Sequence, residues 1–141
     1  MKTIQLTYDH RPALLMEKKR IEQLGGSIEY DGYCHRINGL SVSRSFGDVY
    51  AKPHVSHMPD IYNFKLHSND KFIVIACDGV WDFMSNEEVT NFIHNELRKN
   101  KIDKDNHRQS KKNISYNLAK HILSKGGSDN ISIIICFISS I

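Results

Sequence analysis

The sequence predicts an α+β fold in which helices pack against a sheet. Two short runs, residues 71–77 and 131–138, are almost entirely apolar, as buried strands are. Three other segments repeat apolar residues at helical spacing and are bounded by residues typical of helix ends. Elements of both kinds bury their apolar faces against one another, so we expect a layered arrangement.

The first helix is predicted over residues 14–24. Pro12 precedes this segment, and apolar residues recur in it at roughly helical spacing. Gly25-Gly26 ends it, as a left-handed C-terminal cap does.

A mostly extended region follows the first helix. Residues 27–30 are predicted to form a short strand before a turn at Asp31-Gly32. Residues 36–48 mix apolar and small residues, which predicts a strand or extended segment followed by an irregular loop. Pro53 and Pro59 keep the next stretch non-helical.

The central strand and the second helix come next. The strand is predicted over residues 71–77. Ser85 and Glu88 form the Ser-x-x-Glu pattern of a capping box, which predicts a helix start at this point. The apolar stripe that follows is expected to be core, and it consists of Val89, Phe92, Ile93 and Leu97.

The last third of the chain completes the pattern. Residues 100–113 form a polar, basic linker. A third helix is predicted over residues 114–124, closed by Gly126-Gly127. Residues 131–138 are apolar on both faces, so we expect a strand that is central or covered.

Composition and charge indicate a globular protein. The chain of 141 residues is 40% hydrophobic and 25% charged, which indicates one globular domain or part of a larger one. Net charge is +3, but Lys99 to Lys112 alone carries +4 and the remainder −1, so we expect neither a nucleic-acid nor a membrane surface. Three widely spaced cysteines and no signal peptide favour an intracellular setting, cytoplasmic or nuclear.

Carboxylates next to the two buried strands are the candidate functional residues. Asp78 follows the strand at 71–77, and Asp129 precedes the strand at 131–138. If those strands are antiparallel neighbours, both acids lie at one edge of the sheet, and Asp82 can join them from the following loop. Acids gathered at one edge need a cation, and Mg²⁺ or Mn²⁺ prefers oxygen ligands. Two such ions would form a site for phosphoryl displacement by metal-bound hydroxide.

Five ordered blocks of the sequence resemble the type 2C, metal-dependent protein serine/threonine phosphatases (the PPM family). The blocks are LTYDHRP at 6–12, EKKRI at 17–21 followed by Gly25-Gly26, RINGLSVSRSFGD at 36–48, IACDGVWD at 75–82 and GSDNIS at 127–132. Together they cover nearly the whole chain and are very specific.

The resemblance implies a layered α-β-β-α sandwich with a two-metal centre at one edge, and phosphoserine or phosphothreonine proteins as substrates. Asp78 and Asp129 match family metal ligands, and Asp82 matches an acid of a weaker third metal site. Residues 17–48 correspond to the region around the flap that borders the active site. Arg44 and Asp48 lie within a family signature, but we assign them no chemistry.

The departure from the family pattern is equally informative. The motif Asp-Gly-His-Gly, which in the family carries the metal-bridging Asp and a general-acid His, does not occur in the sequence. The phosphate-binding Arg of the same half has no counterpart either. We therefore expect the chain to be the C-terminal half of the catalytic domain, with no identifiable catalytic residue of its own. Sheet edges and apolar faces should be left uncovered.

These observations leave two main hypotheses. In the first, the chain is part of a Mg²⁺- or Mn²⁺-dependent phosphatase that is inactive alone and needs a missing N-terminal half or a partner chain. In the second, it is a non-catalytic remnant that binds partners or regulates an intact phosphatase. The aspartyl-nucleophile phosphatases fit poorly, because they need a second Asp where this chain has Val80.

Overall fold

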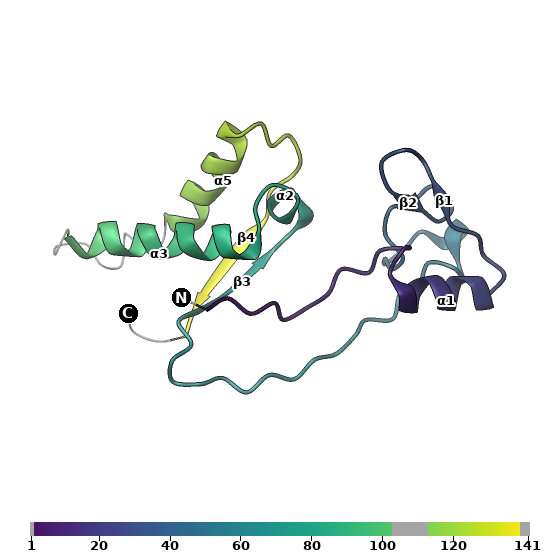
Figure 1. Cartoon of the computed structure of the whole chain (residues 1–141), viewed down its shortest axis with the longest axis horizontal. Coiled ribbons are helices and arrows are strands. Elements are labelled where there is room, and N and C mark those ends of the chain that lie inside the picture. Colours follow the sequence, from purple (N-terminus) through teal and green to yellow (C-terminus); the bar gives the residue numbers. More distant parts are fainter. Residues whose placement is uncertain (1, 103–112, 139–141) are drawn as a thin grey trace. The chain divides into compact units, whose positions relative to one another are not determined.

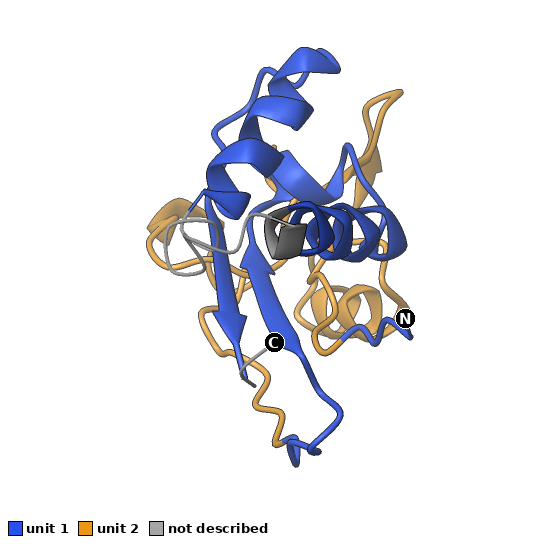
Figure 2. Ribbon diagram, turned by 90° about the vertical axis from the view of Figure 1, so that its left-hand side faces the viewer, with its two compact units in different colours: residues 1–5, 64–141 blue, residues 6–63 orange. Residues whose placement is uncertain are grey.

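The computed structural model describes residues 2–102 and 113–138. The chain divides into two compact units (Figure 2). Unit 1 comprises Met1–Gln5 and Phe64–Ile141, and unit 2 comprises Leu6–Asn63. No helix in the described ranges is both long and apolar enough to cross a membrane. The prediction of a single domain over residues 1–141 stays a prediction.

An antiparallel pair of strands forms the sheet of unit 1 (Figure 1). Strand β3 spans Phe72–Ala76 and strand β4 spans Ile133–Phe137. Their register pairs Phe72 with Phe137 and Ala76 with Ile133. Both predicted strands are confirmed, and so is the antiparallel pairing on which the placement of the two acids depends.

One face of this sheet packs against two helices. Helix α3 spans Asn86–Ile102 and helix α5 spans Ile114–Ser124. Alternate residues of both strands, among them Val74 and Ile135, lie against the buried core that the helices supply. The buried members of this core are Val80, Met84, Val89, Ile93, Leu97, Ile114, Leu118 and Ile122. The α+β class is therefore confirmed.

The opposite face of the same sheet is open among the described residues. Ile75 is 57% exposed and its partner Ile134 is 58% exposed. Cys136 is exposed as well. The expectation that the last strand is central or covered is wrong for this part of the chain, because the sheet described here has two strands and helices on one face. The expected uncovered apolar face is present.

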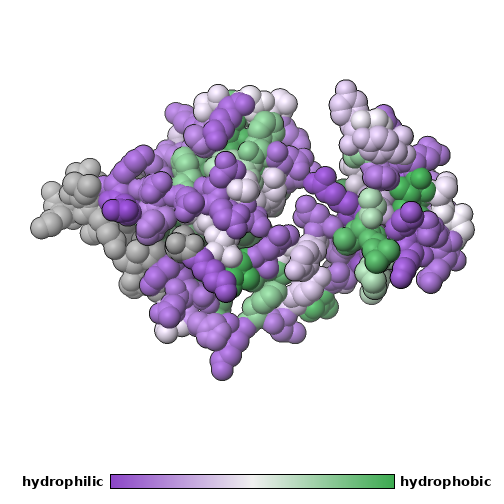
Figure 3. Space-filling view, in the orientation of Figure 1, coloured by the Kyte–Doolittle hydropathy of each residue, from purple (hydrophilic) through white to green (hydrophobic). Residues whose placement is uncertain are grey.

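Helix α3 begins at the predicted capping box. The Glu88 amide donates to Ser85 Oγ at 3.2 Å, and the Ser85 amide donates to Glu88 Oε2 at 2.8 Å. The surface over this helix is mostly hydrophilic in the space-filling view (Figure 3), as its amphipathic pattern predicts. The helix extends to Ile102, so the first residues of the predicted linker are helical. Residues 103–112 of that linker lie outside the described residues.

The first residues of the chain also belong to unit 1. The Thr3 and Thr90 hydroxyls are 2.7 Å apart, and Asn86 Nδ2 donates to Gln5 Oε1 at 3.3 Å. These contacts attach the N-terminal segment to helix α3. Unit 1 is therefore discontinuous in sequence, and unit 2 is inserted into it.

Unit 2 contains one helix and short extended pieces around a small core. Helix α1 spans Leu15–Gln23, and strands β1 (Glu29–Tyr30) and β2 (His35–Arg36) form a hairpin. A 3₁₀ turn, η1, spans Val49–Ala51. The predicted helix and the turn at Asp31-Gly32 are confirmed. The buried core residues are Ile21, Ile37, Ala51 and Val55.

Candidate functional site

The paired strands of unit 1 bring Asp78 and Asp129 to the same end of the sheet. Asp78 lies two residues beyond Ala76, the last residue of β3. Asp129 lies four residues before Ile133, the first residue of β4, which pairs with Ala76. Both side chains are exposed. The structure thus places these two predicted site residues at a common edge.

A glycine allows the two segments to approach closely. A Cβ atom on Gly79 would lie 2.2 Å from the backbone oxygen of Asn130 and 3.6 Å from the Cβ of Asp129. Any other residue at position 79 would push the segment that carries Asp129 away from the segment that carries Asp78. The glycine of the Asp-Gly pair is therefore explained by packing against Asn130.

Short hydrogen bonds to the backbone orient both carboxylates. Asp78 Oδ1 accepts from the Gly79 amide at 3.0 Å, and Asp129 Oδ1 accepts from the Asn130 amide at 2.7 Å. Each carboxylate thus has a hydrogen bond to the backbone of its own turn. Exposed carboxylates at one edge supply the oxygen atoms that Mg²⁺ and Mn²⁺ prefer.

Asp82 lies one helical turn beyond Asp78. Asp78 begins the one-turn helix α2 (Asp78–Trp81), and the Asp82 amide donates to the Asp78 carbonyl oxygen at 2.8 Å. Four residues of helix move Asp82 about 6 Å along the axis. Across the described ranges, no three His, Cys, Asp or Glu side chains are grouped so that they could hold a metal ion. The expected convergence of the three acids therefore stays a prediction.

Two carboxylates still fit a magnesium-type ion. Mg²⁺ is usually held by one or two carboxylates and keeps several water ligands. Asp78 and Asp129 supply the right donor atoms at one edge, so they fit part of such a site. Their role as metal ligands remains a prediction, as does that of Asp82.

A second cluster of charged residues surrounds the buried Glu17 in unit 2, and it was not predicted. Glu17 is 2% exposed although it carries a carboxylate. Its Oε2 accepts from Arg20 Nη2 at 2.8 Å, and its Oε1 accepts from Arg44 at 2.6 Å (Nη2) and 3.1 Å (Nε). Burial alone would raise the pKa of Glu17, but hydrogen bonds from Arg44 and Arg20 outweigh it and lower the pKa to about 2.

Arg44 connects this carboxylate to the end of unit 2. Its Nη1 donates to Asp60 Oδ1 at 2.7 Å and to the Met58 carbonyl oxygen at 2.9 Å. Asp60 Oδ2 lies 2.8 Å from His10 Nε2. Hydrogen bonds from His10 and Arg44 lower the pKa of Asp60 to about 2. The Arg44 guanidinium is therefore structural, because protein acceptors bind it.

Little in the sequence pointed to this cluster. Glu17 and Arg20 are three residues apart on a helix, a spacing that usually gives only a solvent-exposed ion pair. Arg44 and Asp60 lie in irregular segments without periodicity. An arrangement in which one carboxylate binds two arginines depends on tertiary contacts, and no local sequence pattern encodes these.

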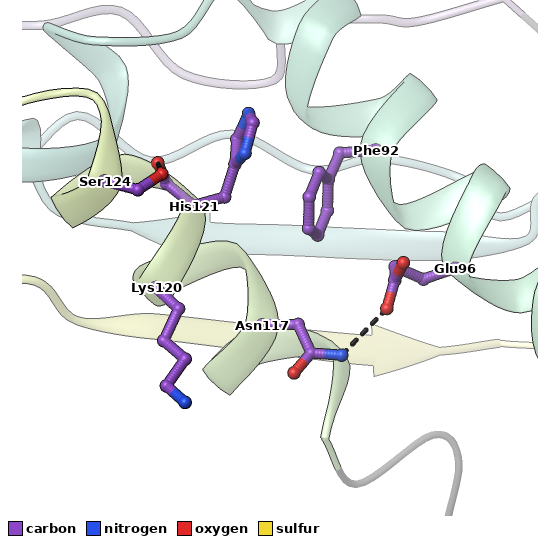
Figure 4. A pocket seen from close by; sticks show the side chains of 6 residues that line it. All are labelled: Phe92, Glu96, Asn117, Lys120, His121 and Ser124. Atoms are coloured by element: carbon purple, nitrogen blue, oxygen red, sulfur yellow. Dashed lines mark hydrogen bonds between the residues drawn. The ribbon is translucent and has the colours of Figure 1, made fainter.

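An open hollow lies between α3 and α5 in unit 1 (Figure 4). Asn117 Nδ2 donates to Glu96 Oε2 at 2.8 Å across it. The rings of Phe92 and His121 lie 5.1 Å apart. These contacts join the two helices. The lining residues are Phe92, Glu96, Asn117, Lys120, His121 and Ser124.

Two carboxylates held at one sheet edge define a candidate cation site of the kind that phosphoryl-transfer enzymes use. The chain belongs to the protein phosphatase 2C family, whose model matches residues 1–131. This result agrees with the resemblance of the five sequence blocks.

Individual relatives place the chain within that family. It is 39% identical over 150 residues to a PP2C-like domain-containing protein, R307, of Acanthamoeba polyphaga mimivirus, covering 96% of this chain and 84% of the relative. It is 37% identical to protein phosphatase 1B of Rattus norvegicus, covering 93% of this chain but 33% of that protein. The chain thus spans most of the viral relative and about a third of the rat phosphatase.

Solved structures support the fold. A structure described as a C. elegans sex determining protein matches with a TM-score of 0.83 and 26% identity, over 96% of this chain and 32% of that one. A phosphatase from a pathogenic strain of Toxoplasma gondii matches with a TM-score of 0.79 and 28% identity, over 95% of this chain and 41% of that one.

Proposed function

We propose that this chain is part of a Mg²⁺- or Mn²⁺-dependent phosphatase that hydrolyses phosphoserine and phosphothreonine on proteins. The observation that carries the proposal is the pairing of β3 with β4, which places Asp78 and Asp129 at one sheet edge. Membership of the protein phosphatase 2C family supports it.

The two aspartates are proposed to hold the cation. When bound, such an ion activates water as a nucleophile and neutralises charge on the phosphoryl group. Asp78 and Asp129 supply oxygen ligands, and their bonds to the Gly79 and Asn130 amides fix the direction of each carboxylate. Gly79 keeps the two backbone segments close enough for both ligands to act on one site.

We further propose that the chain corresponds to the C-terminal part of the family's catalytic domain and has negligible turnover alone. The Asp-Gly-His-Gly motif that the resemblance leads us to expect is absent from the sequence. An additional segment or partner chain would supply the remaining ligands. The odd number and wide spacing of cysteines support an intracellular setting.

Mn²⁺ binding to the 141-residue chain tests the cation site. Calorimetry should detect binding to the wild-type chain and loss of binding in the Asp78→Asn/Asp129→Asn double variant. Glu87→Gln is the matched control, because it removes an exposed carboxylate from the first turn of α3. Equal binding by wild type and double variant would exclude these aspartates as ligands. Metal-dependent hydrolysis of a phosphoserine peptide by this chain would contradict the proposed inactivity.

The open sheet face favours a second candidate function, in which the chain is a binding or regulatory module. Ile75 and Ile134 expose more than half of their area on a face without helices in the described part of unit 1. Large exposed apolar patches mark interaction surfaces. A folded chain that binds no Mn²⁺ would favour this function over the first.

A further inference from the structure

Cys77 lies where strand β3 changes into helix α2, directly before Asp78. The strand register, which pairs Ala76 with Ile133, continues by one more pair, Cys77 with Ser132. The Cys77 amide donates to the Ser132 carbonyl oxygen at 3.2 Å. This is half of the reciprocal exchange that an antiparallel hydrogen-bonded pair normally makes.

The other half of that exchange is made by the side chain. The carbonyl oxygen of Cys77 accepts the Val80 amide at 3.0 Å, because the chain has already turned into α2. The Ser132 amide instead donates to Cys77 Sγ at 3.2 Å. The thiol therefore takes the place of a backbone acceptor at the point where the ladder ends.

The same thiol also holds the segment that carries Asp129. Cys77 Sγ donates to the carbonyl oxygen of Asn130 at 3.2 Å. This is the oxygen that a Cβ on Gly79 would strike. Asn130 is thus fixed between the thiol and the glycine backbone, and Asp129 precedes it.

We propose that Cys77 is a positioning residue for the two-carboxylate edge, and that its thiol holds Asp129 beside Asp78. The inference rests on the proposed function for the role of that edge in cation binding. A thiol suits this position because it both donates and accepts. Alanine would leave the Ser132 amide and the Asn130 carbonyl without their side-chain partner, whereas serine keeps both hydrogen-bonding functions.

The test compares Cys77→Ala, Cys77→Ser and Cys136→Ala in the full chain. Cys136→Ala is the matched control, because it removes an exposed thiol from β4 at a position paired with Ile73. Mn²⁺ affinity is measured by calorimetry, and amide hydrogen exchange at Ser132 is measured by NMR. Exchange at Ile135, in the middle of β4, reports whether the sheet itself is intact.

In Cys77→Ala we expect Mn²⁺ affinity to fall about tenfold, the effect typical of losing a residue that orients a metal ligand. Exchange at Ser132 should accelerate while exchange at Ile135 does not. Cys77→Ser should restore most of both properties, and Cys136→Ala should behave as wild type.

The proposal is overturned if Cys77→Ala keeps wild-type affinity, or if Ser132 exchange does not change. Should Cys77→Ala not fold, Cys77→Ser decides the matter: near-wild-type Mn²⁺ affinity and unchanged exchange at Ser132 would support the proposal, and a fully folded Cys77→Ser with tenfold weaker binding would overturn it. Failure of the wild-type chain to bind Mn²⁺ counts against the proposed function and against this role of Cys77 in it. Exchange at Ser132 distinguishes a failure of the proposed function from a failure of the hydrogen bond to Cys77, because it reports that hydrogen bond without metal.

Discussion

The substitution Glu17→Gln removes a buried negative charge from unit 2 while keeping the size of the side chain. Glu17 accepts hydrogen bonds from Arg20 and Arg44 and is 2% exposed. Its pKa lies at about 2 instead of 4.5. At about 1.4 kcal/mol per pKa unit, the ionised carboxylate stabilises unit 2 by about 3 kcal/mol at neutral pH. This agrees with the cost of removing one partner from a buried ion pair, about 3–5 kcal/mol.

The sign of the pH dependence follows from the lowered pKa. The stabilisation is fully present above about pH 4.5, where the carboxylate is ionised in the folded and unfolded chain. It is lost as the pH falls towards the folded-state pKa of about 2. The difference between wild type and Glu17→Gln should therefore be largest at pH 7 and shrink progressively below pH 4.5.

Urea titrations followed by NMR measure this effect. The Val55 amide, which donates to Ala51 at 2.9 Å, reports the free energy of unfolding of unit 2. Glu22→Gln is the control, because Glu22 is exposed and 3.8 Å from Lys18; it should change stability by less than about 0.5 kcal/mol. A loss below about 1 kcal/mol for Glu17→Gln at pH 7, or a loss that is constant down to pH 3, would refute the reasoning.

Three further predictions concern unit 1. Gly79→Ala places a Cβ 2.2 Å from the Asn130 oxygen and should cost about 1–3 kcal/mol in urea denaturation and weaken Mn²⁺ binding; unchanged binding would contradict the packing argument. Ser85→Ala removes the capping hydroxyl of α3 and should lower the free energy of unfolding by about 1 kcal/mol, monitored by tryptophan fluorescence; no change would mean that the cap is not needed. Ile75→Thr makes the open sheet face more polar and should reduce concentration-dependent association in light scattering, while equal association would place the contact elsewhere.

Local patterns predicted the elements of unit 1 well. The Ser85-x-x-Glu88 pattern marked the start of α3 because both capping hydrogen bonds form within four residues. Strands β3 and β4 were evident because their residues are apolar on both faces. The acids flanking them could be placed at one edge by assuming antiparallel pairing, which the register confirms.

Features that depend on distant contacts were not predictable from the same patterns. The one-turn helix α2 is too short to show periodicity. The burial of Glu17 requires two arginines, one of them 27 residues away. The exposure of Ile134 depends on what else covers the sheet, which the composition of β4 does not encode.

The insertion of unit 2 between Gln5 and Phe64 affects how the chain can diversify. The Thr3–Thr90 and Gln5–Asn86 contacts attach the residues just before the inserted unit to helix α3. From there, the entropic cost of closing a loop grows only logarithmically, by about 0.6 kcal/mol per doubling of its length. Unit 2 can therefore be lengthened, shortened or exchanged at small thermodynamic cost to the sheet that carries Asp78 and Asp129. In evolutionary terms, a change in the length of unit 2 need not disturb the module that carries the candidate chemistry.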